Sequence, residues 1–357
     1  MANAAADPVP RRQRAPRTND FFQQRLAAYR DLTQQALLDL IPAEGPPYLY
    51  DLVPVYPSRL GKGLRAALCF ATCAALSGNQ RMALNSAVSI ELFHNAFLIH
   101  DDVQDGSERR RGAPTLHSGY GIPIAVNVGN ATNLLALRRI MENRGILGPK
   151  ISWQVFEETE RMMRHSLEGQ AIELAWIRDN VCRLAVRDYL HMCLKKTSWY
   201  SFIYPMRVGA LIANRGRLAE DQFGRFGWFM GAAFQIQDDL LNVTGSYRKY
   251  GKEIRGDLWE GKRTLMLIHL LQHCSAKERR AVRQFLAVPR AGHRSQEVAW
   301  LYELMLQHGS IDFARRAARQ LAGAALIEGL QAFRMAPDSE HKRFILEMVL
   351  YVVNRDR

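Results

Sequence analysis

The 357-residue sequence lacks the features that mark membrane-spanning and exported proteins. No continuous apolar run approaches the roughly 18 residues that span a bilayer. One of the longest, AALCFATCAAL, covers only residues 66–76. The first twenty residues, MANAAADPVPRRQRAPRTND, contain no apolar core of the kind that a signal peptide needs. We therefore expect a cytoplasmic protein without a transmembrane segment.

Cysteine is scarce and is not spaced for metal binding. The five cysteines are Cys69, Cys73, Cys182, Cys193 and Cys274. The first two lie one helical turn apart and have no partners at zinc-finger spacing. We interpret all five as buried thiols of a reducing compartment.

Acidic residues are in the minority, because 48 Lys and Arg outnumber 35 Asp and Glu and give a net charge of +13. Such an excess can attract nucleic acid or a membrane surface. However, no run of Lys and Arg alternates with aromatic residues as in single-strand binders. The clusters SERRRGAPT and GKGLR lie beside glycines and acidic motifs. We therefore expect a small polyanion such as a diphosphate and no nucleic-acid partner.

Alternating β-branched runs are also missing, and helical periodicity dominates after the first residues. Residues 1–19 are rich in Ala, Pro and Arg, and we expect a disordered tail that either solubilises the protein or docks an unknown partner. Residues 20–357 show no linker-like break, so we predict one all-α domain. The predicted helices cover 20–41, 63–77, 82–105, 123–146, 151–177, 184–213, 219–243, 263–273, 277–288, 295–308, 310–333 and 338–355.

Two acidic segments share one pattern. FLIHDDVQD (97–105) and FQIQDDLLN (234–242) both read F-x-I-x-D-D-x-x-D/N. On a helix, Asp101 and Asp105 project together, because positions i and i+4 share a face. Acids at a helix carboxyl end repel one another and the helix dipole, so a cation is expected to offset the cost. Hard divalent ions such as Mg²⁺ take carboxylate oxygens and leave positions open for phosphate.

Basic residues accompany both acidic segments. Alone, each is more simply a solvated surface charge, but as a group they describe two anion sites, one bridged by metal and one held by cations alone. The residues of this group are Lys62, Arg65, Arg110, Arg111, Lys196 with Thr197, Lys252 and Lys262.

At this point the sequence resembles the trans-polyprenyl (isoprenyl) diphosphate synthases, and among them the geranylgeranyl diphosphate synthases. The resemblance covers roughly residues 20–355. It rests on five motifs in the family's order: GKGLR (61–65), DDVQD-GSERRRG (101–112), KT (196–197), FQIQDD (234–239) and GK…D…GK (251–262). It implies the isoprenoid synthase fold, a single helical bundle around a central active-site cavity. It also implies a homodimer and a prenyltransferase that joins isopentenyl diphosphate to an allylic diphosphate.

The resemblance also implies roles for single residues. Asp101, Asp102 and Asp105 match the first aspartate-rich motif, in which the first and last acids bind two Mg²⁺. Asp238 matches the ligand of a third Mg²⁺, supported by Asp239. The shell of the allylic diphosphate would comprise Arg110, Lys196, Thr197, Gln235, Lys252 and Lys262. The metal-free site for isopentenyl diphosphate would comprise Lys62, Arg65, His94 and Arg111.

Two positions depart from the family's pattern. Leu60 and Ala66 stand where the first motif usually has Gly and Pro, which leaves both of its cations in place. Asn242 replaces the last acid of the second motif, as in some geranylgeranyl diphosphate synthases. We expect the first acidic segment to be the stronger metal site.

Product length depends on the residues above the first motif. Phe97 and Phe93 lie one and two turns before Asp101 on its face, and they are either ordinary core or the floor of the product cavity. In the family an aromatic residue here limits growth, whereas the small Ala96 would open room. We expect a C20 product rather than C15.

Three other functions remain open. A class I terpene cyclase would share the fold but would not need the second anion site of Lys62, Arg65, His94 and Arg111. A non-catalytic regulatory subunit of a prenyl synthase would be expected to lose an acidic motif, and both persist. A nucleic-acid-binding protein fits only the net charge.

Overall fold

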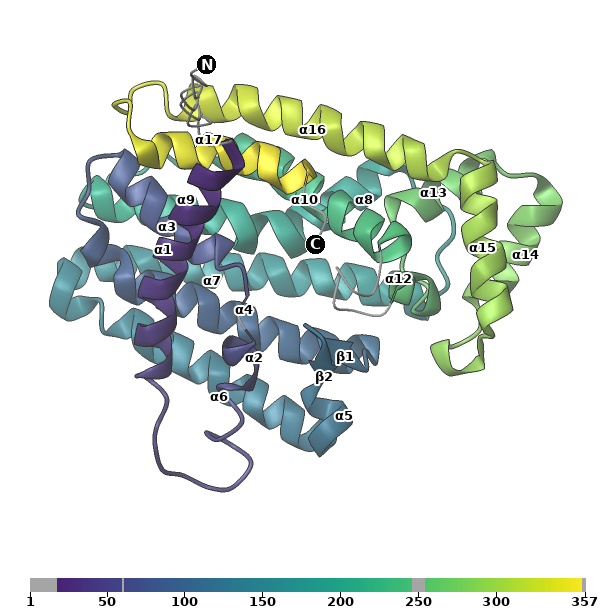
Figure 1. The fold of residues 1–357 in the computed structure, drawn as a ribbon, viewed down its shortest axis with the longest axis horizontal. Coiled ribbons are helices and arrows are strands. Elements are labelled where there is room, and N and C mark those ends of the chain that lie inside the picture. The colour runs from purple at the N-terminus through teal and green to yellow at the C-terminus, as the bar shows by residue number, and fades with distance from the viewer. Residues whose placement is uncertain (1–17, 60, 246–253, 355–357) are drawn as a thin grey trace, which may run out of the picture.

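The computed structural model describes residues 18–59, 61–245 and 254–354, and helices make up most of this part of the chain (Figure 1). Residues 1–17 of the predicted tail and Lys252 lie outside the described residues, whereas the last two residues of the predicted tail begin helix α1. The first half contains α1 (Thr18–Leu38), α2 (Val55–Ser58), α3 (Leu64–Ala75), η1 (Gln80–Ala83), α4 (Leu84–Asp105), β1 (Arg109–Arg110), β2 (Ala113–Pro114), α5 (Leu116–Tyr120), α6 (Ile122–Met141) and α7 (Arg144–Arg178). The second half contains α8 (Val186–Cys193), η2 (Leu194–Ile203), α9 (Tyr204–Ala213), α10 (Gly224–Thr244), α12 (Gly256–Trp259), α13 (Leu265–His273), α14 (Ala276–Leu286), η3 (Arg290–Gly292), α15 (Ser295–Gln307), α16 (Ser310–Ala332) and α17 (Glu340–Asn354). The all-α prediction is confirmed.

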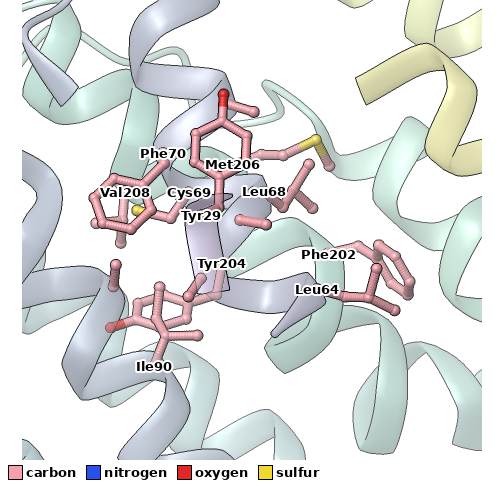
Figure 2. Packing of buried hydrophobic residues seen from close by; sticks show 14 of the residues in the cluster. Tyr29, Leu64, Leu68, Cys69, Phe70, Ile90, Phe202, Tyr204, Met206 and Val208 are labelled. Carbon is pink, nitrogen blue, oxygen red and sulfur yellow. The ribbon is translucent and has the colours of Figure 1, made fainter. Parts of the chain in front are cut away.

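Helix α3 lies at the centre of the bundle because it is apolar on all sides. All of its residues except Ala74 are buried, as expected for a helix without a polar face. Its neighbour α9 approaches closely at Gly209, where a Cβ atom would lie 2.5 Å from the carbonyl oxygen of Cys69. Figure 2 shows the surrounding cluster, in which Phe70 and Leu68 of α3 pack near Tyr29 and Met206.

The buried residues form two hydrophobic clusters, and α10 contributes to both. Met230 and Phe234 belong to the larger cluster around α3, α4, α9 and α17. Ile236 and Leu240 belong to a second cluster with α8, α13, α14 and α15. Figure 1 shows α16 running along one edge of the bundle towards α14 and α15. Because α10 joins the two clusters, its acidic end is fixed relative to both.

Helix α4 places the first acidic segment at its carboxyl end. It stops at Gly106, whose φ of 62° is the left-handed conformation typical of helix ends. Together with η1 it forms a stretch, Gln80–Asp105, that is long and apolar enough to cross a membrane by composition alone. Because 72% of that stretch's most apolar window is buried inside the protein, we interpret it as a core helix.

Several predicted boundaries were wrong for local reasons. The segment 184–213 is not one α-helix, because Leu194–Ile203 adopts π-helical pairing between α8 and α9. The predicted loop after Gly106 contains a β-hairpin, with Arg109 opposite Pro114 and Arg110 opposite Ala113, followed by α5. Helix α7 starts at Arg144 and is kinked at Gly148, whose φ is 78°. All five cysteines are free thiols, and four are buried, whereas Cys182 is only half-buried.

Candidate active site

A cavity of about 870 Å³ lies among α1, α3, α4, α7, η2, α10 and the start of α13. Most of the residues singled out in the sequence line it, although they come from five separate stretches of the chain. These residues are Lys62, Arg65, His94, Asp101, Arg110, Arg111, Lys196, Thr197, Gln235, Asp238, Asp239 and Lys262. Asp102 and Asp105 do not line the cavity.

The first acidic segment divides its carboxylates between the cavity and the protein interior. Asp101 lines the cavity, with Arg110 Nη2 at 3.4 Å and Lys196 Nζ at 3.6 Å. Asp102 is buried, and it accepts hydrogen bonds from Arg110 Nε at 2.7 Å and from the hydroxyl of Tyr56 at 2.5 Å. The carboxylate predicted as part of the metal site is therefore bound by protein groups.

Asp105 lies on the same face as Asp101 but pairs with a lysine from another part of the chain. Lys262 Nζ is 2.6 Å from Asp105 Oδ2 and 2.9 Å from Glu260 Oε2. Burial, and next the charge of Asp101, raise the pKa of Asp105 to about 7, although Lys262 opposes the shift. Burial therefore disfavours the charged carboxylate, and an added cation would favour it.

The second acidic segment, at the end of α10, also has one carboxylate that is bound by protein groups, although both of its aspartates line the cavity. Asp238 lines the cavity. Asp239 accepts hydrogen bonds from the hydroxyl of Tyr189 at 2.7 Å and from Gln235 Nε2 at 2.8 Å. Burial raises the pKa of Asp239 to about 6, against the effect of these two hydrogen bonds. Asn242 does not face a ligand, because its side-chain oxygen accepts the backbone N–H of Asp257 at 3.0 Å.

The π-helical segment η2 brings Lys196 and Thr197 to the cavity between the two acidic ends. Thr197 donates to Gln235 Oε1 at 2.6 Å. Lys196 forms an ion pair with Glu173, a buried residue of α7 that lines the cavity. Burial alone would lower the pKa of Lys196, but Glu173 and Asp101 raise it above its usual value. We did not predict Glu173, because EGQAIELAW has no charge pattern that distinguishes it from a surface helix.

The other end of the cavity is basic. Arg65 is buried, its Nη1 lies 3.2 Å from His94 Nε2, and its Nη2 donates to the hydroxyl of Tyr200 at 2.7 Å. Lys62 lies over the ring of Tyr351, 5.6 Å from its centroid. These groups come from α3, α4, η2 and α17, so this basic surface forms only when the bundle assembles.

Arg111 reaches this basic end from the turn of the β-hairpin. Its φ is 52°, and the next residue, Gly112, has a φ of 77°, which together match a tight hairpin turn. A Cβ atom on Gly61 would lie 2.6 Å from Arg111 Nη2, so the glycine leaves room for the guanidinium. Burial and the nearby cations Arg110 and Arg65 lower the pKa of Arg111 to about 10, although Glu91 opposes the shift. Glu91 is the carboxylate at this end, and we did not predict it.

The wall beside the acidic end becomes apolar on α4 and α7. Phe97 lines the cavity together with Leu98 and Met163. Its ring meets that of Tyr200 edge-to-face at 5.5 Å, and Phe93 lies behind it at 6.3 Å. Phe93 and Ala96 are buried and do not line the cavity. The expected extra room at Ala96 is therefore not found.

The residues present fit a divalent metal that is completed by phosphate oxygens. Among residues 18–59, 61–245 and 254–354, no three candidate ligands converge on one point. This agrees with Mg²⁺ chemistry, in which one or two carboxylates and several waters or phosphates share the ion. Asp101 supplies oxygen donors from the end of α4, and Asp238 supplies them from α10. Asp105, one turn beyond Asp101, pairs with Lys262 and does not line the cavity. The high pKa of Asp105 indicates that further positive charge would be favourable here.

Known proteins share both the sequence pattern and the fold. A family model described as polyprenyl synthetase matches residues 46–305. A geranylgeranyl pyrophosphate synthase of Geoglobus acetivorans is 28% identical over 326 residues, which cover 91% of this chain and 96% of the relative. A geranylfarnesyl diphosphate synthase of Aeropyrum pernix is 29% identical over 324 residues, 86% of this chain and 98% of the relative.

The fold comparison gives the same result. The crystal structure of geranylgeranyl pyrophosphate synthetase from Pyrococcus horikoshii Ot3 aligns with a TM-score of 0.82 at 27% identity, over 95% of this chain and 100% of that one. The predicted isoprenoid synthase fold and the predicted enzyme class, a polyprenyl diphosphate synthase, are confirmed. The chain belongs to the polyprenyl synthetase family.

Proposed function

We propose that this short-chain prenyl diphosphate synthase joins isopentenyl diphosphate to an allylic diphosphate in a Mg²⁺-dependent reaction, with C20 geranylgeranyl diphosphate as the product. One observation carries the proposal. A single cavity has carboxylates at one end and cations at the other, which suits two diphosphates held in two different ways. Asp101, Asp105 and Asp238 would hold the metal, and Mg²⁺ would supply charge that stabilises the departing diphosphate.

The side chains at the acidic end prepare the allylic diphosphate to leave. Arg110, Lys196 and Lys262 place positive charge where the C–O bond breaks and its electron pair moves onto the diphosphate. Such preorganised charge is the largest contribution in many enzymes. Thr197 and Gln235 orient the phosphate oxygens through their own hydrogen bond. Lys252 is proposed for this shell from the sequence alone.

The side chains at the basic end hold isopentenyl diphosphate. Lys62, Arg65, His94 and Arg111 bind its diphosphate without a metal, so that its double bond faces the allylic carbon. The new C–C bond forms from that double bond, and the departing diphosphate takes the proton that is then lost. Apolar groups such as Phe97 and Met163 keep water from the carbocation.

Product length is set by the apolar wall. Phe97 lines the cavity, and contacts with Tyr200 and Phe93 hold its ring in place. The ring therefore blocks further elongation of the prenyl chain. We expect Phe97→Ala to give products longer than those of the unmodified protein. Unchanged products would show that another residue forms the floor.

The direct test is to incubate the pure protein with isopentenyl diphosphate, Mg²⁺ and each allylic diphosphate in turn. Mass spectrometry then gives both the chain length and any cyclisation. Geranylgeranyl diphosphate is the expected product. A cyclic hydrocarbon would favour a terpene cyclase, and no product from any starter would favour a regulatory subunit.

We also propose a homodimer. The exposed faces of α6 and α7 carry large apolar side chains, among them Leu134, Met141, Trp153 and Phe156. Leu134, Met141 and Phe156 line one groove, which a second copy of the chain would cover. Light scattering of the pure protein would give about twice the mass of 40.6 kDa, and Leu134→Arg is expected to reduce it to a monomer.

A further inference from the structure

The second aspartate of each acidic pair is held by a tyrosine from a neighbouring helix. Tyr56, on the short helix α2, donates to Asp102 Oδ2 at 2.5 Å. Tyr189, on α8, donates to Asp239 Oδ2 at 2.7 Å. Both tyrosines are 1% exposed, and the two aspartates are 1% and 6% exposed. The same contact thus occurs twice, at the ends of α4 and α10.

The other oxygen of each aspartate is also in use. Arg110 Nε lies 2.7 Å from Asp102 Oδ1, and Gln235 Nε2 lies 2.8 Å from Asp239 Oδ1. Arg110 and Gln235 themselves line the cavity. Each buried carboxylate therefore connects a tyrosine to a second side chain that lines the cavity. Tyr56 lies outside the cavity lining, whereas Tyr189 lies at its edge.

This connection can orient the ends of both helices. Adjacent residues on an α-helix point about 100° apart. When the second aspartate is fixed, the rotation of the helix end is fixed too, and Asp101 and Asp238 are aimed at the cavity. Partners behind a metal ligand act in this way in many metal sites.

We propose that Tyr56 and Tyr189 are positioning residues, and that Asp102 and Asp239 connect them to the site instead of binding metal directly. The inference rests on the proposed function, because it assigns the binding of Mg²⁺ and diphosphate to the groups that are oriented. Asp102 and Asp239, which the sequence analysis counted with the metal site, thus act through the residues beside them.

The two tyrosines differ in importance. When the hydroxyl of Tyr56 is removed, Asp102 still accepts a hydrogen bond from the charged guanidinium of Arg110. Such charge-assisted hydrogen bonds are strong, so Asp102 should stay in place. Asp239 keeps only the neutral amide of Gln235 when the hydroxyl of Tyr189 is removed. Tyr189→Phe is therefore the more damaging change.

The experiment compares three phenylalanine variants that each lose one buried hydroxyl. Tyr56→Phe and Tyr189→Phe remove the contacts in question. Tyr204→Phe is the matched control, because Tyr204 is fully buried, lies away from the cavity lining, and has its hydroxyl 2.7 Å from that of Thr159. Calorimetry measures the binding of inorganic pyrophosphate with and without Mg²⁺, and thermal unfolding gives the Tm of each variant.

We expect Tyr189→Phe to weaken the Mg²⁺-dependent binding of pyrophosphate about 10–100-fold, and Tyr56→Phe by less. Tyr204→Phe should lower the Tm by a similar amount and leave the binding unchanged. Wild-type binding in both test variants, or an equal loss in the control, would overturn the proposal.

A second pair of variants separates a connecting carboxylate from a metal ligand. Asp239→Asn keeps an oxygen that can accept the hydrogen bond from Tyr189 but loses the one from Gln235 Nε2. It should still weaken Mg²⁺-dependent binding less than Asp238→Asn, which removes a charged metal ligand. An equal loss would make Asp239 a direct ligand and the proposal wrong. Pyrophosphate binding tests positioning separately from turnover, so failure of the wild type to form a prenyl diphosphate would count against the proposed function alone.

Discussion

The acidic and basic ends of the cavity differ in charge, and we assign a diphosphate to each. At the acidic end, Asp101, Asp105 and Glu260 surround Lys262 and Lys196. At the basic end, Arg65 and Arg111 lie near Glu91, and Lys62 lines the same cavity. The two ends belong to one cavity, so the positive and negative charges are separated within that cavity.

The pKa shifts at the two ends are opposite in direction. Burial and the charge of Asp101 raise the pKa of Asp105 to about 7. Burial and neighbouring cations lower the pKa of Arg111 to about 10. In both cases the charged form is disfavoured, because like charges are gathered away from water. Each end is thus prepared for a ligand of opposite charge: a metal cation at the acidic end and a bare diphosphate at the basic end.

Removing a carboxylate that faces the cavity should have the largest effect. We expect Asp101→Ala to lower the rate of elongation about 10³-fold, since charge stabilisation of the leaving group is lost. Product formation with isopentenyl diphosphate, an allylic diphosphate and Mg²⁺ measures the effect. Near-normal turnover would remove Asp101 from the proposed metal site. Asp312→Ala, an exposed acid of α16, is a suitable control.

Chelation of the metal should separate the two ends directly. With EDTA, binding of a non-ionising thio analogue of the allylic diphosphate should weaken on the order of 100-fold, because a metal contact of several kcal/mol disappears. Binding of isopentenyl diphosphate should change little. Calorimetry with each ligand measures both affinities, and equal losses for the two ligands would contradict the division into a metal-dependent and a metal-free end.

A change at the basic end should be smaller and confined to one substrate. Arg65→Ala should raise the KM for isopentenyl diphosphate about 30-fold, which corresponds to about 2 kcal/mol for a lost charged contact. The KM for the allylic substrate should stay close to the wild-type value. Steady-state kinetics with each substrate varied in turn gives both values. Arg225→Ala, which removes an arginine paired with Glu328 on the surface, serves as the control.

The smallest expected effect concerns the carboxylate at the basic end. Burial raises the pKa of Glu91 above its usual 4.5, against the opposing charge of Arg65. Between these two pKa values the folded protein holds a proton that the unfolded chain has lost, so stability falls as the pH rises. Glu91→Gln removes this dependence. Its Tm relative to wild type should therefore increase as the pH rises above 4.5, and a constant difference would refute the assignment.

The sequence was sufficient to predict most of the helices, and most of the site residues that it indicated do line the cavity. Helical periodicity is a local signal, and repeated motifs such as FLIHDDVQD and FQIQDDLLN identify their own helix ends. Partners from distant segments leave no such signal. Tyr56, Tyr189 and Glu173 were missed because their roles come from packing against other helices, which one sequence does not reveal.

Local geometry was missed for a related reason. The hairpin that carries Arg110 and Arg111 depends on two left-handed residues, and the arginine among them is not a typical turn former. The sequence also did not indicate that Asp102 lies outside the cavity lining, or that Asp102 and Asp239 are both held by buried tyrosines. Helical spacing indicates which residues share a face of a helix. The elements packed around that helix determine which of its faces borders the cavity.

The π-helical segment Leu194–Ile203 limits which insertions and deletions the chain can tolerate. Its backbone pairs residues five apart, whereas an α-helix pairs residues four apart. Gly169 and Gly231 press against its backbone from two sides, where added Cβ atoms would lie 2.2 Å from Lys196 N and Ser198 Oγ. Deleting one codon here would rotate the following side chains by about 100°. Descendants of this enzyme can exchange many residues in the segment, but they must inherit its length.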